Sequence, residues 1–158
     1  MARYAQHTSV PADRSRAEIE RALTRYGASG FGYSWERKEV AINPMPVYGA
    51  KTELHEFASI VFQFKARRIR LDVPMPSARE AGSEAKAEAA VRQRWRALLL
   101  VIKAKLEAVE SRISSLEQEF LANIVTESGL TIGEHIVPQL SEAVRSGRLL
   151  PGAGETSR

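Results

Sequence analysis

The stretch Ser83–Ile113, SEAKAEAAVRQRWRALLLVIKAKLEAVESRI, decides the fold of this chain. It contains no proline and no glycine, and its apolar residues recur at the spacing of one helical face. That face carries Val91, Trp95, Leu98, Leu99, Ile102, Leu106, Val109 and Ile113. Basic residues line both of its margins. The stretch is therefore predicted to be one long helix that covers an apolar layer of the molecule.

Upstream of this helix the apolar period changes from that of a helix to that of β-strands. The alternating apolar residues are Phe31, Tyr33 and Trp35, then Ile60, Phe62 and Phe64, then Ile69, Leu71 and Val73. The last two runs predict a hairpin joined at residues 65–67, and Pro74 and Pro76 close the sheet. Val40 and Ile42 suggest a further strand. Residues 43–58 are expected to form a long connection with one helical turn at 52–57.

Capping boxes, in which a Ser or Thr is followed three residues later by Glu or Gln, mark the expected helix starts. They occur at Ser15/Glu18, Ser77/Glu80, Ser115/Gln118 and Thr131/Glu134, and Ser83 is an alternative start for the long helix. Gly27, Gly129 and Gly147 are the matching stops.

The sequence thus predicts an α+β fold, in which a small antiparallel sheet of three to four strands packs on one long helix, with additional short C-terminal helices. Trp95 and Leu99 are expected to pack against Phe31, Trp35, Phe62 and Phe64. Residues 1–150 would form a single domain, and residues 151–158 a disordered tail.

Composition limits the classes of protein to consider. The 158 residues include no cysteine, which excludes disulfides and thiolate metal sites. No signal peptide is recognisable at the N-terminus, and the longest apolar run, Ala97–Ile102, is far too short to span a bilayer. We expect a protein that is not attached to a membrane and that acts in the cytoplasm.

Motifs for catalysis and cofactor binding are not recognisable in the sequence. The three histidines, His7, His55 and His135, are far apart and share no metal-binding spacing. The paired carboxylates fall on predicted helices, where solvated faces are the usual explanation. The sequence therefore predicts a non-enzymatic protein without a cofactor or a metal.

Basic clusters are the strongest functional signal, in a chain of net charge +4. The hairpin carries Arg67, Arg68 and Arg70, and one margin of the long helix carries Arg92, Arg96 and Lys103. If the two clusters adjoin, they form a cationic groove that attracts phosphates. Tyr33, Tyr48 and Phe57 are candidates for stacking on unpaired bases.

Three blocks resemble a group of small proteins encoded by tailed phages and prophages: Arg25–Glu36 (RYGASGFGYSWE), Arg67–Pro76 (RRIRLDVPMP) and Arg94–Ile113 (RWRALLLVIKAKLEAVESRI). That group has no assigned activity, so no site residue is carried over from it. The resemblance implies an accessory phage protein that acts inside a bacterial host cell.

The leading hypothesis is a phage accessory protein that binds nucleic acid, with single-stranded DNA favoured, through the groove between hairpin and helix. The first alternative is a protein that binds and inhibits a bacterial defence or host enzyme, using residues 43–58. The second is a self-assembling structural protein. Homo-oligomers are expected in each case, because Leu100, Val101 and the 116–125 stripe offer more apolar helix surface than a small sheet covers.

Overall fold

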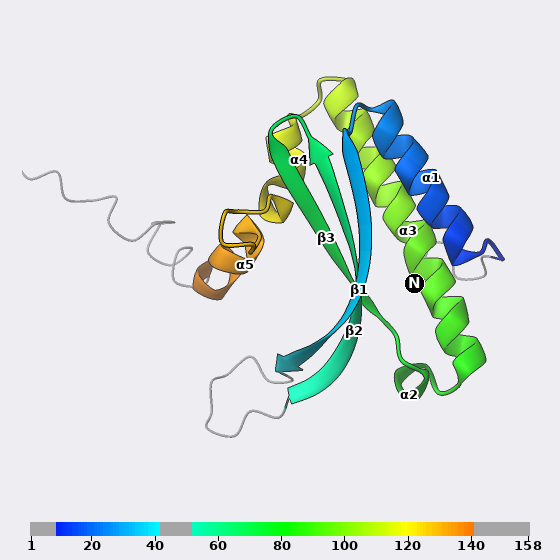
Figure 1. Ribbon diagram of the computed structural model, residues 1–158. Coiled ribbons are helices and arrows are strands. Elements are labelled where there is room, and N and C mark those ends of the chain that lie inside the picture. The colour runs from blue at the N-terminus through cyan, green and yellow to red at the C-terminus, as the bar shows by residue number, and fades with distance from the viewer. Residues whose placement is uncertain (1–8, 42–51, 141–158) are drawn as a thin grey trace, which may run out of the picture.

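A computed structural model describes residues 9–41 and 52–140 of the chain. It confirms the α+β fold, with a three-stranded antiparallel sheet, one long helix and short C-terminal helices (Figure 1). The elements are α1 (Ala12–Arg25), β1 (Gly30–Ala41), β2 (Thr52–Phe64), β3 (Arg67–Met75), α2 (Ala78–Ala81), α3 (Glu84–Glu110), α4 (Leu116–Phe120), η1 (Leu121–Asn123), α5 (Ile132–Ile136) and η2 (Val137–Gln139). None of the helices in the described ranges has the length and apolar character that crossing a membrane requires.

The sheet has the order β1-β2-β3, and its two pairs are both antiparallel. β1 runs without a break from Gly30 to Ala41, so Val40 belongs to this strand and not to a further one, and Ile42 lies outside the described residues. β2 begins at Thr52, so the helical turn expected at 52–57 is also wrong. Residues 53–57 show no clear alternation, but they pair along their length with β1, and this pairing fixes them as a strand. The centre of the predicted 43–58 connection lies outside the described residues.

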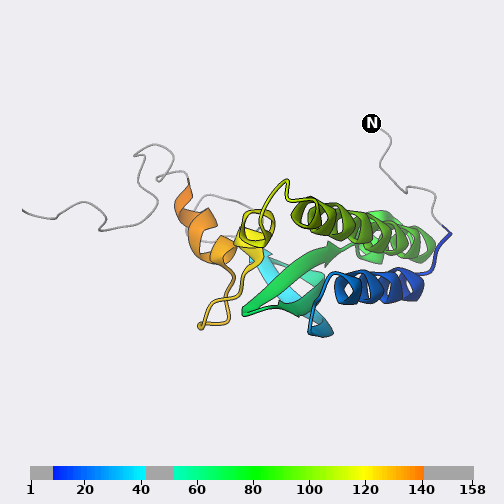
Figure 2. The ribbon, with the colours of Figure 1, turned by 90° about the horizontal axis from the view of Figure 1, so that it is seen from above.

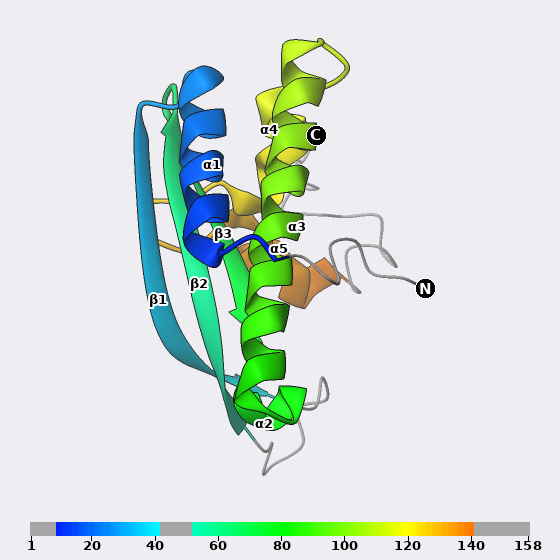
Figure 3. The same ribbon diagram turned by 90° about the vertical axis from the view of Figure 1, so that its right-hand side faces the viewer.

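Helices α1 and α3 lie side by side on one face of the sheet, which we call the inner face (Figures 2 and 3). Trp95 and Leu99 of α3 are buried there with Phe62, while Phe31 and Phe64 pack at the margin. Trp35 does not join this core, because 50% of it is exposed. The predicted packing on α3 is therefore confirmed for the three phenylalanines and wrong for Trp35.

Helix α1 starts earlier than its sequence suggests. Its N-cap is Pro11, whose side chain makes no capping hydrogen bond. Ser15 lies inside the helix, fully buried, and its hydroxyl has no hydrogen-bond partner. The expected capping box of Ser15 and Glu18 is therefore wrong. The stop is correct, since Gly27 adopts a φ of 95° that favours glycine.

The other predicted caps are present. Ser77, Ser115 and Thr131 each form a capping box, and Ser83 caps α3. The two predicted helix starts near residue 80 are thus both present: Ser77 caps α2, and Ser83 caps α3. Gly82, with a φ of 85°, separates these two helices.

The C-terminal segment covers the first part of the β3 edge, at residues 68–70. The backbone N–H of Val125 donates to the carbonyl of Arg68 at 2.8 Å, and Ile124 forms a bridge with Ile69. Leu116 and Phe120 are buried in the core, where Phe120 meets Phe62 edge to face at 5.7 Å. Leu116 and Phe120 of the 116–125 stripe are therefore covered by their own chain, whereas Leu121 is 52% exposed, and the predicted homo-oligomer stays a prediction.

Candidate nucleic-acid interface

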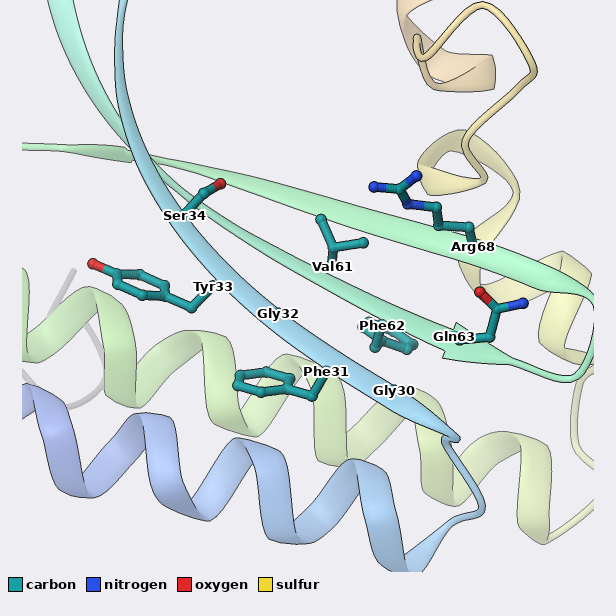
Figure 4. Close-up of a pocket in the computed structure, with 9 residues that line it drawn as sticks. All are labelled: Gly30, Phe31, Gly32, Tyr33, Ser34, Val61, Phe62, Gln63 and Arg68. Atoms are coloured by element: carbon teal, nitrogen blue, oxygen red, sulfur yellow. The ribbon is translucent and has the colours of Figure 1, made fainter.

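The sheet separates Arg68 and Arg70 of the hairpin cluster from the cluster on the long helix. In β3, Arg68 and Arg70 alternate with buried Ile69 and Leu71, so their side chains leave the outer face. Figure 4 shows Arg68 pointing away from the helices, opposite to Phe31. The cluster of Arg92, Arg96 and Lys103 belongs to α3, which covers the inner face. The predicted groove between hairpin and helix is therefore wrong.

Arg70 and Arg67 also form ion pairs within the chain. The Arg70 side chain is 17% exposed, and its guanidinium donates to Asp72 at 3.1 Å, to Glu134 at 2.5 Å and to the carbonyl of Gly129 at 2.8 Å. Arg67 lies 3.7 Å from Glu117. Arg70 thus links the sheet to α5 and to the turn before it, and its charge is neutralised there.

A different set of cations meets between α1 and α3. A hollow of about 200 Å³ is lined by Glu18, Arg21, Ala22, Arg25 and Lys103, and we call it the α1–α3 groove. Glu18, Arg21 and Arg25 follow one another at three- and four-residue spacing, which puts them on one side of α1. The buried residues Ile19 and Leu23 fix that side by holding the opposite side of α1 against the core.

The cations of the α1–α3 groove outnumber its carboxylate. Arg21, Arg25 and Lys103 are exposed, and none of them forms an ion pair with another described residue. Glu18 accepts a hydrogen bond from Arg96 at 2.9 Å and lies 3.5 Å from Arg14. Its charge is thus already balanced, and the groove has an excess of positive charge.

The hydrogen bond from Arg96 holds the pKa of Glu18 below its ordinary value of 4.5, and Lys103 and Arg14 add to this effect. Burial acts in the opposite direction and is outweighed. The carboxylate is therefore ionised at neutral pH, and Arg96 stays bound to it. Protonation of Glu18 in acid would weaken its interaction with Arg96 and remove a negative charge from the groove.

This pKa predicts a pH dependence of stability. Because the pKa is lower in the folded protein than in the unfolded chain, the stabilisation is complete above 4.5 and is lost as the pH falls through the folded value. We expect Glu18→Gln to shrink the drop in the urea midpoint between pH 6 and pH 3. Glu20→Gln is the control, since Glu20 is exposed on the same helix. Equal drops in the two variants would contradict the prediction.

Arg92 is not part of the α1–α3 groove. It lies 4.0 Å from Glu88 and lines another hollow, of about 580 Å³, together with Glu56 and Glu84. The three predicted helix cations therefore separate: Lys103 lines the α1–α3 groove, Arg96 holds its carboxylate, and Arg92 faces acidic residues.

The candidate stacking residues do not gather at one place. Tyr33 is on the inner face, with its ring 5.5 Å from that of Trp95 and 4.8 Å from the Arg16 guanidinium. Phe57 alternates with buried Ala58 and belongs to the outer face. Tyr48 lies outside the described residues. The stacking platform is therefore not formed by Tyr33 and Phe57.

The outer face has a shallow hollow of its own, of about 390 Å³ (Figure 4). Its floor contains Gly30 and Gly32, which leave room above β1, and Gln63 and Arg68 stand at its rim. Among the described residues, no group of three His, Asp or Glu side chains is placed to hold a metal ion. His135 is close to two hydroxyl groups. Its Nε2 lies 3.2 Å from the Thr126 hydroxyl and 3.1 Å from the Ser128 hydroxyl.

A scan of protein-family models, a search of curated proteins and a search of solved structures each gave no match to this chain. The resemblance to small proteins of tailed phages therefore stays a prediction.

Proposed function

We propose that the protein binds nucleic acid through the α1–α3 groove. The observation that supports this proposal is the meeting of Arg21, Arg25 and Lys103 at one hollow, without an ion pair to another described residue. The groove takes the place of the hairpin–helix surface that the sequence suggested. Arg68, exposed on the opposite face, is then not part of the binding surface.

Cations in such an arrangement contact the phosphate backbone. Each cation that neutralises a phosphate releases a condensed counterion, and this makes binding strongly salt-dependent. Arginine adds a planar fork of donors that fits a phosphate in two hydrogen bonds. No aromatic residue lines the groove, so recognition would follow the backbone and not the base sequence.

Single-stranded DNA is the ligand to test first, with a duplex of equal length in parallel. We expect the affinity of the wild type for labelled single-stranded DNA to fall linearly with salt on logarithmic axes. The triple variant Arg21→Gln, Arg25→Gln, Lys103→Gln should reduce the magnitude of that slope by about 2, since each lost contact to a single strand removes about 0.7. Fluorescence anisotropy at several salt concentrations measures both quantities.

The control removes three exposed cations from elsewhere on the described surface: Arg68→Gln, Arg79→Gln, Lys86→Gln. It changes the net charge equally, so a general charge effect would weaken both triple variants alike. Specific use of the α1–α3 groove requires that the control keep the wild-type slope. Absence of binding by the wild type at low salt would contradict the proposal outright.

The accessory role in a phage, and the alternative of binding a bacterial defence or host enzyme, stay predictions. A pull-down from host cells with and without nuclease treatment distinguishes a protein partner from nucleic acid. A stoichiometric protein retained after nuclease treatment would favour the protein partner over nucleic acid.

A further inference from the structure

The two edge strands of the sheet, β3 and β1, differ in what covers them. The β3 edge is covered at residues 68–70 by Asn123, Ile124 and Val125. β1 pairs over its twelve residues with β2, and no other described strand pairs with it. Within residues 9–41 and 52–140, its second side is therefore an open edge with a row of backbone donors and acceptors (Figure 3).

Monomeric proteins usually protect an open edge with charged residues, prolines, bulges or short strands. The first half of β1, Gly30–Trp35 (GFGYSW), contains no charged residue and no proline. Its outward-facing residues, Gly30, Gly32 and Ser34, are small enough for another strand to approach closely. This half of the edge is open to pairing with a further strand.

The inner side of the same edge carries aromatic surface that the core does not cover. Tyr33 is 43% exposed and Trp35 is 50% exposed. The guanidinium of Arg16 lies over the Tyr33 ring, and that of Arg37 lies 5.3 Å from the centre of the Trp35 ring. Both rings are thus partly sheltered by arginines, and each still offers apolar area next to the open backbone edge.

We propose that two copies of this chain pair through β1, antiparallel about a two-fold axis at Ser34, so that their sheets become continuous. In this register Tyr33 lies opposite Trp35 of the second copy, and Trp35 lies opposite its Tyr33. The half-exposed rings of both copies then become cross-strand neighbours, which adds to the backbone hydrogen bonds. Both copies keep their helices on the same side of the joint sheet.

A second copy fits this edge because the strand is complementary to itself. Its charged residues at 36, 37 and 38 fall opposite Gly32, Phe31 and Gly30 of the second copy, so no two like charges meet. A shift that centres the axis on residue 36 would put Glu36 opposite Glu36. The proposal rests on the sheet edge alone and does not depend on the α1–α3 groove.

Variants at Ser34 test the pairing, because this residue would face its own copy. Ser34 is exposed, and Ser34→Lys would set two lysines against each other across the axis. We expect sedimentation equilibrium to show a dimer for the wild type and for Ser34→Ala, and a dissociation constant raised about tenfold or more for Ser34→Lys. Thermal unfolding followed by circular dichroism checks that Ser34→Lys is folded.

The natural chain has no cysteine, so single cysteines report the register. Ser34→Cys should form a disulfide dimer on mild oxidation, because directly opposite residues lie within the range of a disulfide. Gly32→Cys is the matched control, since its two copies would be about 13 Å apart. A monomeric wild type, a dimer insensitive to Ser34→Lys, or equal cross-linking of the two cysteine variants would overturn the proposal.

Discussion

Replacing Trp95 by alanine should lower the free energy of unfolding by about 3–5 kcal/mol. Trp95 is 2% exposed and lies at the centre of α3, between the inner face of the sheet and α1. Its ring contacts that of Tyr33 at 5.5 Å and lies 5.4 Å from the Arg16 guanidinium. The truncation removes a large buried side chain and leaves a cavity that rigid neighbours fill only in part.

Urea unfolding followed by far-UV circular dichroism measures this loss. Val101→Ala is the control, because Val101 is on the same helix and 46% exposed. It should change the free energy of unfolding by less than about 1 kcal/mol. Similar losses in the two variants would mean that α3 does not pack on the sheet as described.

The variant Arg70→Met should destabilise the protein by roughly 1.5–3 kcal/mol, without weakening nucleic-acid binding by the folded molecules. Methionine keeps much of the aliphatic stem but removes the donors to Asp72, Glu134 and Gly129. Asp72 and Glu134 then lose the charged donor that Arg70 supplies, although Ser59 and the backbone N–H of Thr131 still donate to them. The link from β3 to α5 and to the turn before it is broken.

Arg68→Met is the matched control, because Arg68 is two residues away on the same face of β3 and is exposed. It should leave the urea midpoint unchanged. Both variants are measured by urea unfolding and by DNA titration under folding conditions. A loss of affinity at unchanged stability for Arg70→Met would instead return this residue to the binding surface that the sequence suggested for it.

Local signals in the sequence were sufficient for most of the fold. Ser77, Ser115 and Thr131 each start a helix because the capping box needs only residues within one turn. The α3 stripe is readable because its buried residues, such as Trp95 and Leu99, repeat at helical spacing over many turns. The predicted helix start at Ser15 is wrong because the helix begins at Ala12, although the spacing of Ser15 and Glu18 fits a capping box.

Features set by pairing at long range could not be predicted in this way. Residues 52–57 (TELHEF) lack the regular alternation of polar and apolar side chains that indicates a strand. They belong to β2 because they pair along their length with β1. Likewise, the exposure of Trp35 depends on where α1 and α3 end over the sheet, which no local pattern gives.

The placement of the basic clusters, in contrast, could have been derived from the sequence. The apolar stripe of α3 must pack on the apolar face of the hairpin, and strand alternation sends Arg68 and Arg70 to the opposite face. The α1–α3 groove had a signal too, because Arg21 and Arg25 both lie away from the apolar stripe of α1. The packing of α1 against α3, which brings Lys103 beside Arg21 and Arg25, could not be predicted from the sequence.

Beyond Glu56, which pairs with Met75, the strands β1 and β2 continue as a two-stranded ribbon without β3 (Figure 1). A two-stranded ribbon is only marginally stable by itself. We therefore expect the ribbon to open at a free-energy cost well below that of global unfolding, while the three-stranded part stays folded. The molecule would then combine a cooperative body with an extension that changes shape independently.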